Sequence, residues 1–199
     1  HTDAQMEHYD IAETWSTDHI REEQTKRLRA VVAQARKAPF YARMLDEAGL
    51  TPENIRSPED IRCLPFTSKD DLRAQYPDHL CCVPRADLVR MHCSSGTTGS
   101  PVAICYTQKD VDTWASLMAR SMFATGIRRE DTFQNMSGYG LFTGGLGIHY
   151  GAERLGCMTI PAGAGNTRRQ IKLIKDFGVT AVHILPSYAL HVAQQIEAE

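Results

Sequence analysis

The sequence predicts an α/β protein in which an N-terminal helical region is followed by alternating strand–helix units with a mainly parallel sheet. Short helical patterns joined by polar turns occupy residues 1–77. Strand-like and helical runs then alternate over residues 131–199, and this alternation is typical of parallel strands connected by crossover helices. Apolar residues make up 42% of the 199 residues, which is enough for a buried core. We therefore expect two domains, a helical region over 1–77 and an α/β domain over 78–199.

Helix signals divide the N-terminal region. The pair Thr17-Asp18 predicts the cap of a first helix, whose apolar residues recur at helical spacing and stop before Pro39. Residues 40–49 predict a second helix with glycine as its C-terminal stop. The segments SPED (57–60) and TSKD (67–70) have the composition of helix N-termini.

The pattern changes to strands beyond residue 88. Two strand-like runs, LVRMHC (88–93) and VAICYT (102–107), flank a polar loop. Thr107 is expected to cap an amphipathic helix that carries Trp114 and Leu117 on its apolar face and ends at Gly126. Strands are then predicted within 131–137, 157–163 and 179–186, and helices within 144–156, 166–178 and 187–199.

Composition argues against several classes of protein. A formal net charge of −2 lacks the basic excess expected of a protein that binds nucleic acid or an anionic membrane surface. No apolar run approaches the length of a membrane span, and the first residues are unlike a secretory signal. The six cysteines form no C-x-x-C pair and no zinc-site spacing. We therefore expect reduced thiols, no metal site built by the chain, and a cytoplasmic location.

The loop between the first two strands, SSGTTGSPV (94–102), has the composition of a phosphate-binding turn. Its glycines let the backbone approach a ligand closely, successive N–H groups in such a turn form an anion-binding nest, and its hydroxyls add donors. It is not a Walker A loop, because no Gly-Lys-Ser/Thr follows. A flexible linker is the alternative, but both flanks are apolar and β-prone.

Further segments resemble one family of enzymes. GYGLFTGGLGIHYGAERLGC (138–157) follows the loop, and the other segments, in the same order, are APFYARMLDEAGL (38–50), LPFTSKDDLRAQYP (64–77), YTQKDVDTWA (106–115) and ILPSYAL (184–190). Over essentially its whole length the chain resembles the adenylate-forming superfamily and, within it, the phenylacetate–coenzyme A ligases. The Ser/Thr/Gly loop is typical of the superfamily, whereas segment 138–157 is specific to the aryl-acetate ligases.

The resemblance implies a two-step reaction. ATP and an arylacetic acid give an acyl adenylate and pyrophosphate, and the thiol of coenzyme A then displaces AMP. The implied cofactors and substrates are ATP, Mg²⁺ and coenzyme A, and the implied assembly is a homodimer. Because transition-state charge develops on the phosphates, metal and oriented donors are expected to supply most of the catalysis.

The resemblance also assigns residues. Phosphate binding is expected from Ser94, Ser95, Gly96, Thr97, Thr98 and Gly99. Lys69 resembles a lysine that approaches the nucleotide phosphates, and its alternative is a solvated lysine at a helix start. Substrate binding is expected from Ser137, Tyr139, Phe142, Gly144 and Gly145, which lie where a strand leads into a helix.

Three further expectations come from a position that differs from the relatives, from two histidines that the reaction does not need, and from segments of the relatives that have no counterpart here. Relatives often carry an aromatic residue where Ser137 stands, so the acid pocket is larger or more polar than one for unsubstituted phenylacetate. His149 and His183 are expected to be structural, because neither step needs a histidine base. Segments that hold the adenine, the ribose and the metal in the longer relatives have no counterpart, so we expect a partial large domain that is inactive alone. The alternatives are adenylation of another aromatic acid for a different acceptor, and a non-catalytic nucleotide-binding or dimerisation module.

Overall fold

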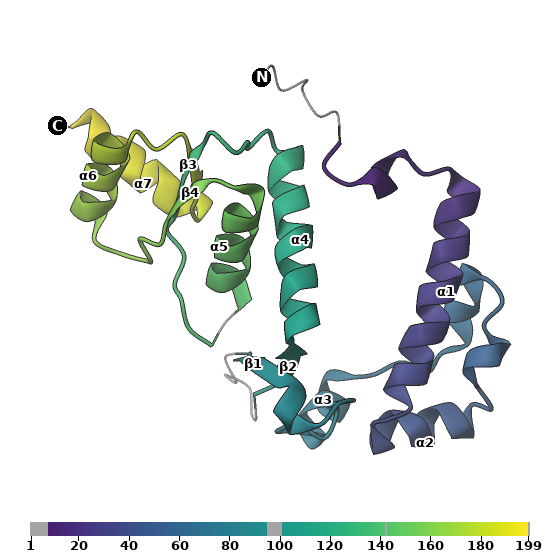
Figure 1. The fold of residues 1–199 in the computed structure, drawn as a ribbon. Coiled ribbons are helices and arrows are strands. Elements are labelled where there is room, and N and C mark those ends of the chain that lie inside the picture. The colour runs from purple at the N-terminus through teal and green to yellow at the C-terminus, as the bar shows by residue number, and fades with distance from the viewer. Residues whose placement is uncertain (1–7, 95–100, 142, 199) are drawn as a thin grey trace. The chain divides into compact units, whose positions relative to one another are not determined.

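The computed structural model describes residues 8–94, 101–141 and 143–198, and it divides the chain into two compact units. The first unit ends at Gln108 and the second begins at Lys109. Helices precede a hairpin in the first unit, and the second alternates strands and helices, as Figure 1 shows. The α/β class with a mainly parallel sheet is thereby confirmed. The predicted domains, 1–77 and 78–199, stay a prediction.

The first unit is mostly helical. Its α-helices are α1 (Thr17–Ala35), α2 (Pro39–Glu47) and α3 (Lys69–Ala74), and its 3₁₀ helices are η1 (Ile11–Thr14), η2 (Pro52–Asn54), η3 (Pro58–Cys63) and η4 (Arg85–Asp87). Val32, Leu45 and Ile55 bring α1, α2 and the segment after η2 into one apolar core. These side chains are at most 5% exposed, so their burial supplies much of the favourable free energy of this unit.

Helix ends in the first unit follow the sequence signals closely. Ser16, rather than the predicted Thr17-Asp18 pair, caps α1, because its hydroxyl accepts the His19 N–H. Ser68 and Asp71 form the capping box predicted within TSKD. The SPED segment begins a 3₁₀ helix, η3, rather than an α-helix.

Two antiparallel strands close the first unit. β1 (Leu88–Cys93) pairs with β2 (Ala103–Thr107), with a register shift between Leu88 and Arg90. Beyond the last ladder pair, Ser94 N–H donates to the Val102 carbonyl and Val102 N–H donates to Ser94 Oγ, each at 2.9 Å. The predicted polar loop therefore leaves and re-enters a hydrogen-bonded hairpin, while residues 95–100 lie outside the described residues.

A three-stranded parallel sheet organises the second unit. Its elements are α4 (Gln108–Ala124, whose first residue belongs to the first unit), β3 (Thr132–Asn135), α5 (Thr143–Leu155), β4 (Met158–Ile160), α6 (Thr167–Phe177), β5 (Ala181–His183) and α7 (Pro186–Glu197). The strand order is β4-β3-β5, so β3 is central. Met122, Phe133, Ala152 and Cys157 form the core between α4, α5 and the sheet.

The strands are shorter than the sequence runs that predicted them. Only residues with a partner in the parallel ladder count as strand, and the ladder ends where the chain turns into the loops at its carboxyl edge. On α4, Leu117 is 57% exposed, although the helical pattern placed it on the apolar face. The buried face of α4 is formed instead by Val111, Ala115, Ala119, Met122 and Phe123.

Candidate functional site

The candidate site lies at the carboxyl edge of the parallel sheet, around Asn135. Asn135 is the last residue of β3 and is fully buried. Its Nδ2 donates to the Gly145 carbonyl at 2.8 Å, and its Oδ1 accepts the Ser137 N–H at 3.1 Å. Because one partner can only accept and the other can only donate, the orientation of the amide is fixed. Asn135 therefore ties the loop after β3 to the first turn of α5.

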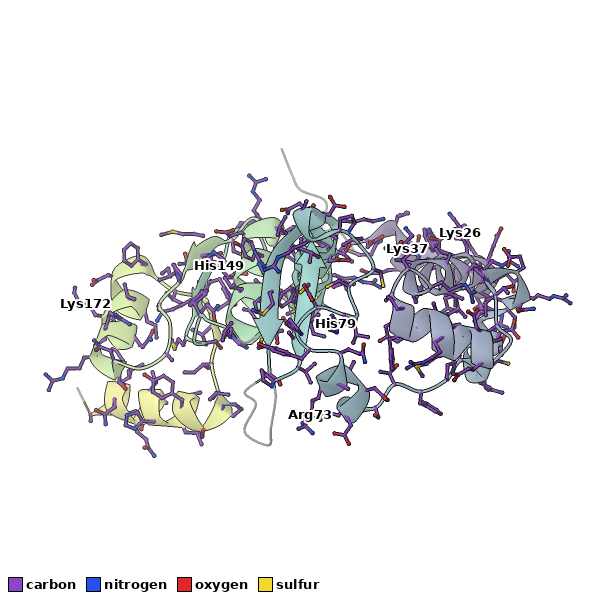
Figure 2. All side chains as sticks on the ribbon, turned by 90° about the horizontal axis from the view of Figure 1, so that it is seen from below. Lys26, Lys37, Arg73, His79, His149 and Lys172 are labelled. Atoms are coloured by element: carbon purple, nitrogen blue, oxygen red, sulfur yellow. The ribbon has the colours of Figure 1, made fainter. Side chains whose placement is uncertain are left out.

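A chain of hydrogen bonds leads from Asn135 to the surface. Nδ2 also lies 2.9 Å from the hydroxyl of Tyr139, which is 3.2 Å from Nδ1 of His149. His149 Nε2 in turn meets Glu153 Oε1 at 3.0 Å, and Figure 2 labels His149 on its helix. Burial raises the pKa of the Tyr139 phenol, so the hydroxyl stays protonated and can donate to His149. Tyr139 is thereby held in one orientation at the edge of the sheet.

A second branch joins Asn135 to the neighbouring strand. Nδ1 of His183, the last residue of β5, lies 3.2 Å from Asn135 Oδ1 and 2.9 Å from Ser137 Oγ. Since the Asn135 oxygen only accepts, Nδ1 carries the hydrogen. Burial lowers the pKa of His183, so its imidazole is neutral and Nε2 keeps a lone pair. Ser137, in the loop after β3, and His183, at the end of β5, thus form one polar pair.

Gly145 allows the loop to pack against the helix start. A Cβ atom at this position would lie 2.3 Å from the Gly138 carbonyl oxygen and 3.4 Å from Tyr139 Cα. A Cβ at Gly144 would meet no described residue within 4 Å. The glycine pair therefore has two uses: Gly145 admits the chain's own loop, and Gly144 leaves open space at the N-terminus of α5.

A buried amide pair supports the neighbouring loop after β4. Gln134 Nε2 donates to Gln170 Oε1 at 2.7 Å, and both side chains are fully buried. Gln170 Nε2 donates to the carbonyls of Gly163 and Gly165, at 2.7 and 3.0 Å. Gly163 N–H also donates to the Asn135 carbonyl. The loops that follow β3 and β4 are thus fixed to each other by hydrogen bonds.

The structure brings together three of the five residues predicted to bind the acid. Ser137, Tyr139 and Gly145 meet around Asn135, and Gly144 precedes Gly145 in the same helical turn. The fifth, Phe142, lies outside the described residues. Of the predicted phosphate loop, Ser94 is described at the base of the hairpin. Ser95, Gly96, Thr97, Thr98 and Gly99 lie outside the described residues.

Lys69 belongs to the first unit, whereas the network around Asn135 belongs to the second. It is the first residue of α3 and is exposed. Its neighbour Asp70 pairs with Arg73 at 3.1 Å, so that carboxylate already has a cationic partner. The position is compatible with either predicted use of Lys69, a contact to phosphate or a solvated helix start.

Asn135 was not identified from the sequence, and His183 was given only a structural role. Asn135 was not singled out, although Gln134 and Asn135 together place two amides inside a strand with buried neighbours, and buried polar side chains require partners. His183 was expected to be structural, and it does hold the loop. It also presents a second ring nitrogen that no described residue bonds.

Removing the Asn135 amide is expected to destabilise the protein. Asn135→Ala would leave the Gly145 carbonyl and the Ser137 N–H without their partner, and one such orphaned buried group costs about 1–3 kcal/mol. The free energy of unfolding of the complete protein, measured in urea, should fall by that amount. Gln195→Ala, at an exposed position of α7, is the control, and equal stability of the two variants would contradict the role given to Asn135.

The described residues offer no ready metal centre and no membrane span. Within the described ranges, no group of three or more His, Cys, Asp or Glu side chains is placed to hold a metal ion. Every helix in those ranges is too short or too polar to cross a bilayer. All six cysteines are described, and each is a free thiol. The side chains that meet around Asn135 carry amide, hydroxyl and imidazole groups.

Curated relatives match almost the whole chain. Phenylacetate–coenzyme A ligases from Pseudomonas putida, Escherichia coli and Thermus thermophilus are 46, 44 and 46% identical to it, over 99, 96 and 92% of its residues. The chain spans only 45, 44 and 41% of the length of these relatives. No family profile matches the chain.

Solved structures of acyl-CoA ligases superpose on the chain. A 2-hydroxyisobutyryl-CoA ligase in complex with 2-HIB-AMP and CoA is 34% identical and superposes with a TM-score of 0.83, over 91% of this chain and 40% of that one. The same enzyme in its postadenylation state, with R3-HIB-AMP, is 30% identical and gives a TM-score of 0.86 over 96% of this chain and 42% of that one. In both sequence and fold, the chain is therefore a homologue of the N-terminal portion of the phenylacetate–coenzyme A ligases, in the adenylate-forming superfamily.

Proposed function

We propose that these residues form the N-terminal part of an ATP-dependent, AMP-forming ligase that joins an arylacetic acid to coenzyme A. The observation that carries the proposal is the 44–46% identity to phenylacetate–coenzyme A ligases over 92–99% of the chain. In the first step, a carboxylate oxygen of the acid attacks the α-phosphorus of ATP and pyrophosphate leaves. In the second, the sulfur of coenzyme A attacks the acyl carbon and AMP leaves. ATP and coenzyme A are available in the cytoplasm, where we place the enzyme, and we expect it to be a homodimer.

The hairpin loop is the proposed phosphate site. Ser94 and Val102 hold the two ends of this loop together through two hydrogen bonds. Ser94, Ser95, Gly96, Thr97, Thr98 and Gly99 then supply hydroxyls and backbone N–H groups to the phosphates. Lys69, exposed at the start of α3, would add one positive charge as pyrophosphate departs.

The carboxyl edge of the parallel sheet is the proposed acid site. In open α/β sheets, ligands bind beyond the carboxyl ends of the strands. Tyr139 is fixed there by Asn135 and His149, and a Cβ at Gly144, in the first turn of α5, would meet no described residue within 4 Å. With Ser137, Phe142 and Gly145, these residues would orient the carboxylate for attack. Orientation of the two reactants is itself a large part of such catalysis.

We propose that magnesium reaches the site bound to the phosphates of ATP. The described residues contain no carboxylate cluster that would bind the ion by itself. Mg²⁺ commonly keeps several waters and is held largely by substrate phosphates. No step of the reaction is therefore assigned to a metal ligand of these residues.

A different acid is the second candidate, and the Ser137–His183 pair favours it. The pair places two polar side chains at the carboxyl edge of the sheet, whereas the ring of unsubstituted phenylacetate is hydrocarbon and offers them no hydrogen-bond partner. The superposed relatives are ligases named for 2-hydroxyisobutyryl-CoA, an aliphatic hydroxy acid thioester. The reaction would be the same, with a more polar acid in place of phenylacetate.

Pyrophosphate exchange with the complete enzyme tests the proposal. Incorporation of labelled pyrophosphate into ATP should require the acid, and phenylacetate and hydroxylated acids should be compared. Gly96→Val is expected to abolish ATP binding measured by calorimetry, because a side chain there blocks the approach of the backbone to phosphate. Thermal unfolding of that variant should match the wild type. An unchanged affinity for ATP would contradict the assignment of the loop, and an absence of exchange with every acid would contradict the function.

A further inference from the structure

Cys81 and Cys105 form a pair of neighbouring thiols in the first unit. Cys105 lies in β2, and Cys81 directly follows the turns after α3, where its N–H donates to the Asp78 carbonyl at 2.9 Å. The thiol of Cys81 is hydrogen-bonded to that of Cys105. Tyr76, Pro77 and Asp78 line the same cavity as Cys105, with a volume of about 350 Å³. The chain segments on either side of β1 thus bring two half-buried sulfur atoms together.

The other cysteines have different surroundings. Cys82 Sγ lies 3.4 Å from the Leu80 carbonyl oxygen, and Cys93 Sγ lies 3.2 Å from Met91 Sδ. Of the remaining two cysteines, one is exposed and the other is buried in the second unit. Cys82 and Cys93 are therefore matched controls, because each is close in sequence to one member of the pair but contacts another group.

The environment of Cys81 determines how the pair reacts. Burial, and next the neighbouring Cys105 thiol, raise the pKa of Cys81 to about 11, so this thiol is protonated at neutral pH. Because the thiolate is the nucleophile, Cys81 attacks a disulfide slowly at that pH. A thiol of high pKa is also a poor leaving group, so a disulfide that contains it is reopened slowly. We therefore expect slow oxidation of the pair and a disulfide that persists once formed.

We propose that Cys81 and Cys105 are a site of disulfide formation, with a low-molecular-weight disulfide such as oxidised glutathione as the oxidant. One thiolate of the pair attacks the S–S bond of the oxidant, which breaks to give a mixed disulfide and one glutathione thiolate. The second thiol of the pair loses its proton and attacks the protein sulfur of the mixed disulfide, and a second glutathione thiolate leaves. The two protons of the pair end on the two glutathione molecules, so the pair is oxidised and the glutathione disulfide is reduced. This inference does not depend on the proposed function.

Peptide mapping of the complete protein tests the proposal. The protein would be incubated with oxidised glutathione, its remaining thiols alkylated, and the chain digested with trypsin. Cleavage releases residues 74–85 and 91–109, and mass spectrometry should find these two peptides joined by a disulfide. The joined peptides should form faster at about pH 9 than at about pH 7, because the thiolate is the attacking species.

Each of these peptides carries two cysteines, so single variants assign the bond. Cys81→Ser and Cys105→Ser should each lower the yield of joined peptides by about tenfold or more, whereas Cys82→Ser and Cys93→Ser should leave it within about twofold. The oxidised wild type should also unfold at a higher temperature than the reduced protein, because the disulfide closes a ring around β1 and constrains the unfolded chain. In Cys105→Ser the two treatments should give the same unfolding temperature.

Several outcomes would overturn the assignment. Joined peptides that persist in Cys81→Ser or Cys105→Ser, or that disappear in Cys82→Ser or Cys93→Ser, would place the bond elsewhere. A bound glutathione that is never displaced, or the absence of joined peptides at both pH values, would show that the two sulfur atoms cannot reach each other. If one serine variant of the pair does not fold, the other decides, because the loss of either sulfur removes the bond.

Discussion

Gly145→Val is expected to reduce acid adenylation by the complete enzyme about 100-fold or more. A Cβ at position 145 would lie 2.3 Å from the Gly138 carbonyl oxygen and 3.0 Å from the Gly138 carbonyl carbon. Both are backbone atoms, so the loop has to move as a unit. That loop carries Ser137 and Tyr139, and displacing reacting groups by about 1 Å can cost about 100-fold in rate. The measurement is kcat/KM in pyrophosphate exchange.

Gly140→Ala is the matched control for this prediction. Gly140 lies in the same loop, but a Cβ there would meet no described residue within 4 Å. We expect its activity to remain within about twofold of the wild type. Overpacking at position 145 should also lower the free energy of unfolding, by about 1–3 kcal/mol. If Gly145→Val kept full activity, the loop would not need the position that Asn135 and α5 give it.

The position of the candidate-site segment at a strand end could be predicted from the sequence because several of its signals are local, whereas its role in binding stays a prediction. Tyr139 and Gly145 lie in the segment 138–157 that resembles the family most specifically, and Ser137 directly precedes it. The change from strand to helix in that segment also placed them at a strand end, where ligands bind. The alternation of strands and helices predicted the parallel sheet for the same reason, since each crossover is written in consecutive residues.

The contacts that escaped prediction join residues far apart in the sequence. Asn135 and His183 are 48 positions apart, and only the pairing of β3 with β5 brings them together. A single polar residue inside an apolar run leaves no periodic signal. Its orientation also depends on which backbone groups the fold leaves unpaired. The ends of the strands could not be predicted for a related reason. A strand ends where its hydrogen bonds to the neighbouring strand end, and β-prone residues can continue beyond that point.

Gly151→Val is expected to destabilise the second unit more than any exposed substitution. Gly147 and Gly151 lie four residues apart on α5 and therefore on one face of the helix. Figure 1 shows α5 beside α4, and a Cβ at position 151 would lie 2.5 Å from Met118 Cβ and 3.2 Å from the Ala119 nitrogen. At Gly147, a Cβ would meet the Trp114 ring at 2.3 Å. The two helices approach so closely only because both positions lack side chains.

The sharpest test of this close packing is whether Gly151→Ala raises or lowers the free energy of unfolding. In an exposed helix, Gly→Ala stabilises by roughly 1 kcal/mol, because alanine has the higher helix propensity. At position 151 the added methyl would meet Met118 and the backbone of Ala119, neither of which is the free end of a flexible side chain. We therefore expect Gly151→Ala to lower the free energy of unfolding of the complete protein by about 1–3 kcal/mol, and Gly151→Val to lower it further. Arg154→Ala, an exposed position on the same helix, should change it by no more than about 0.5 kcal/mol. A Gly151→Ala variant more stable than the wild type would mean that α5 can move away from α4 at little cost, and the close packing would then not determine where the candidate site lies.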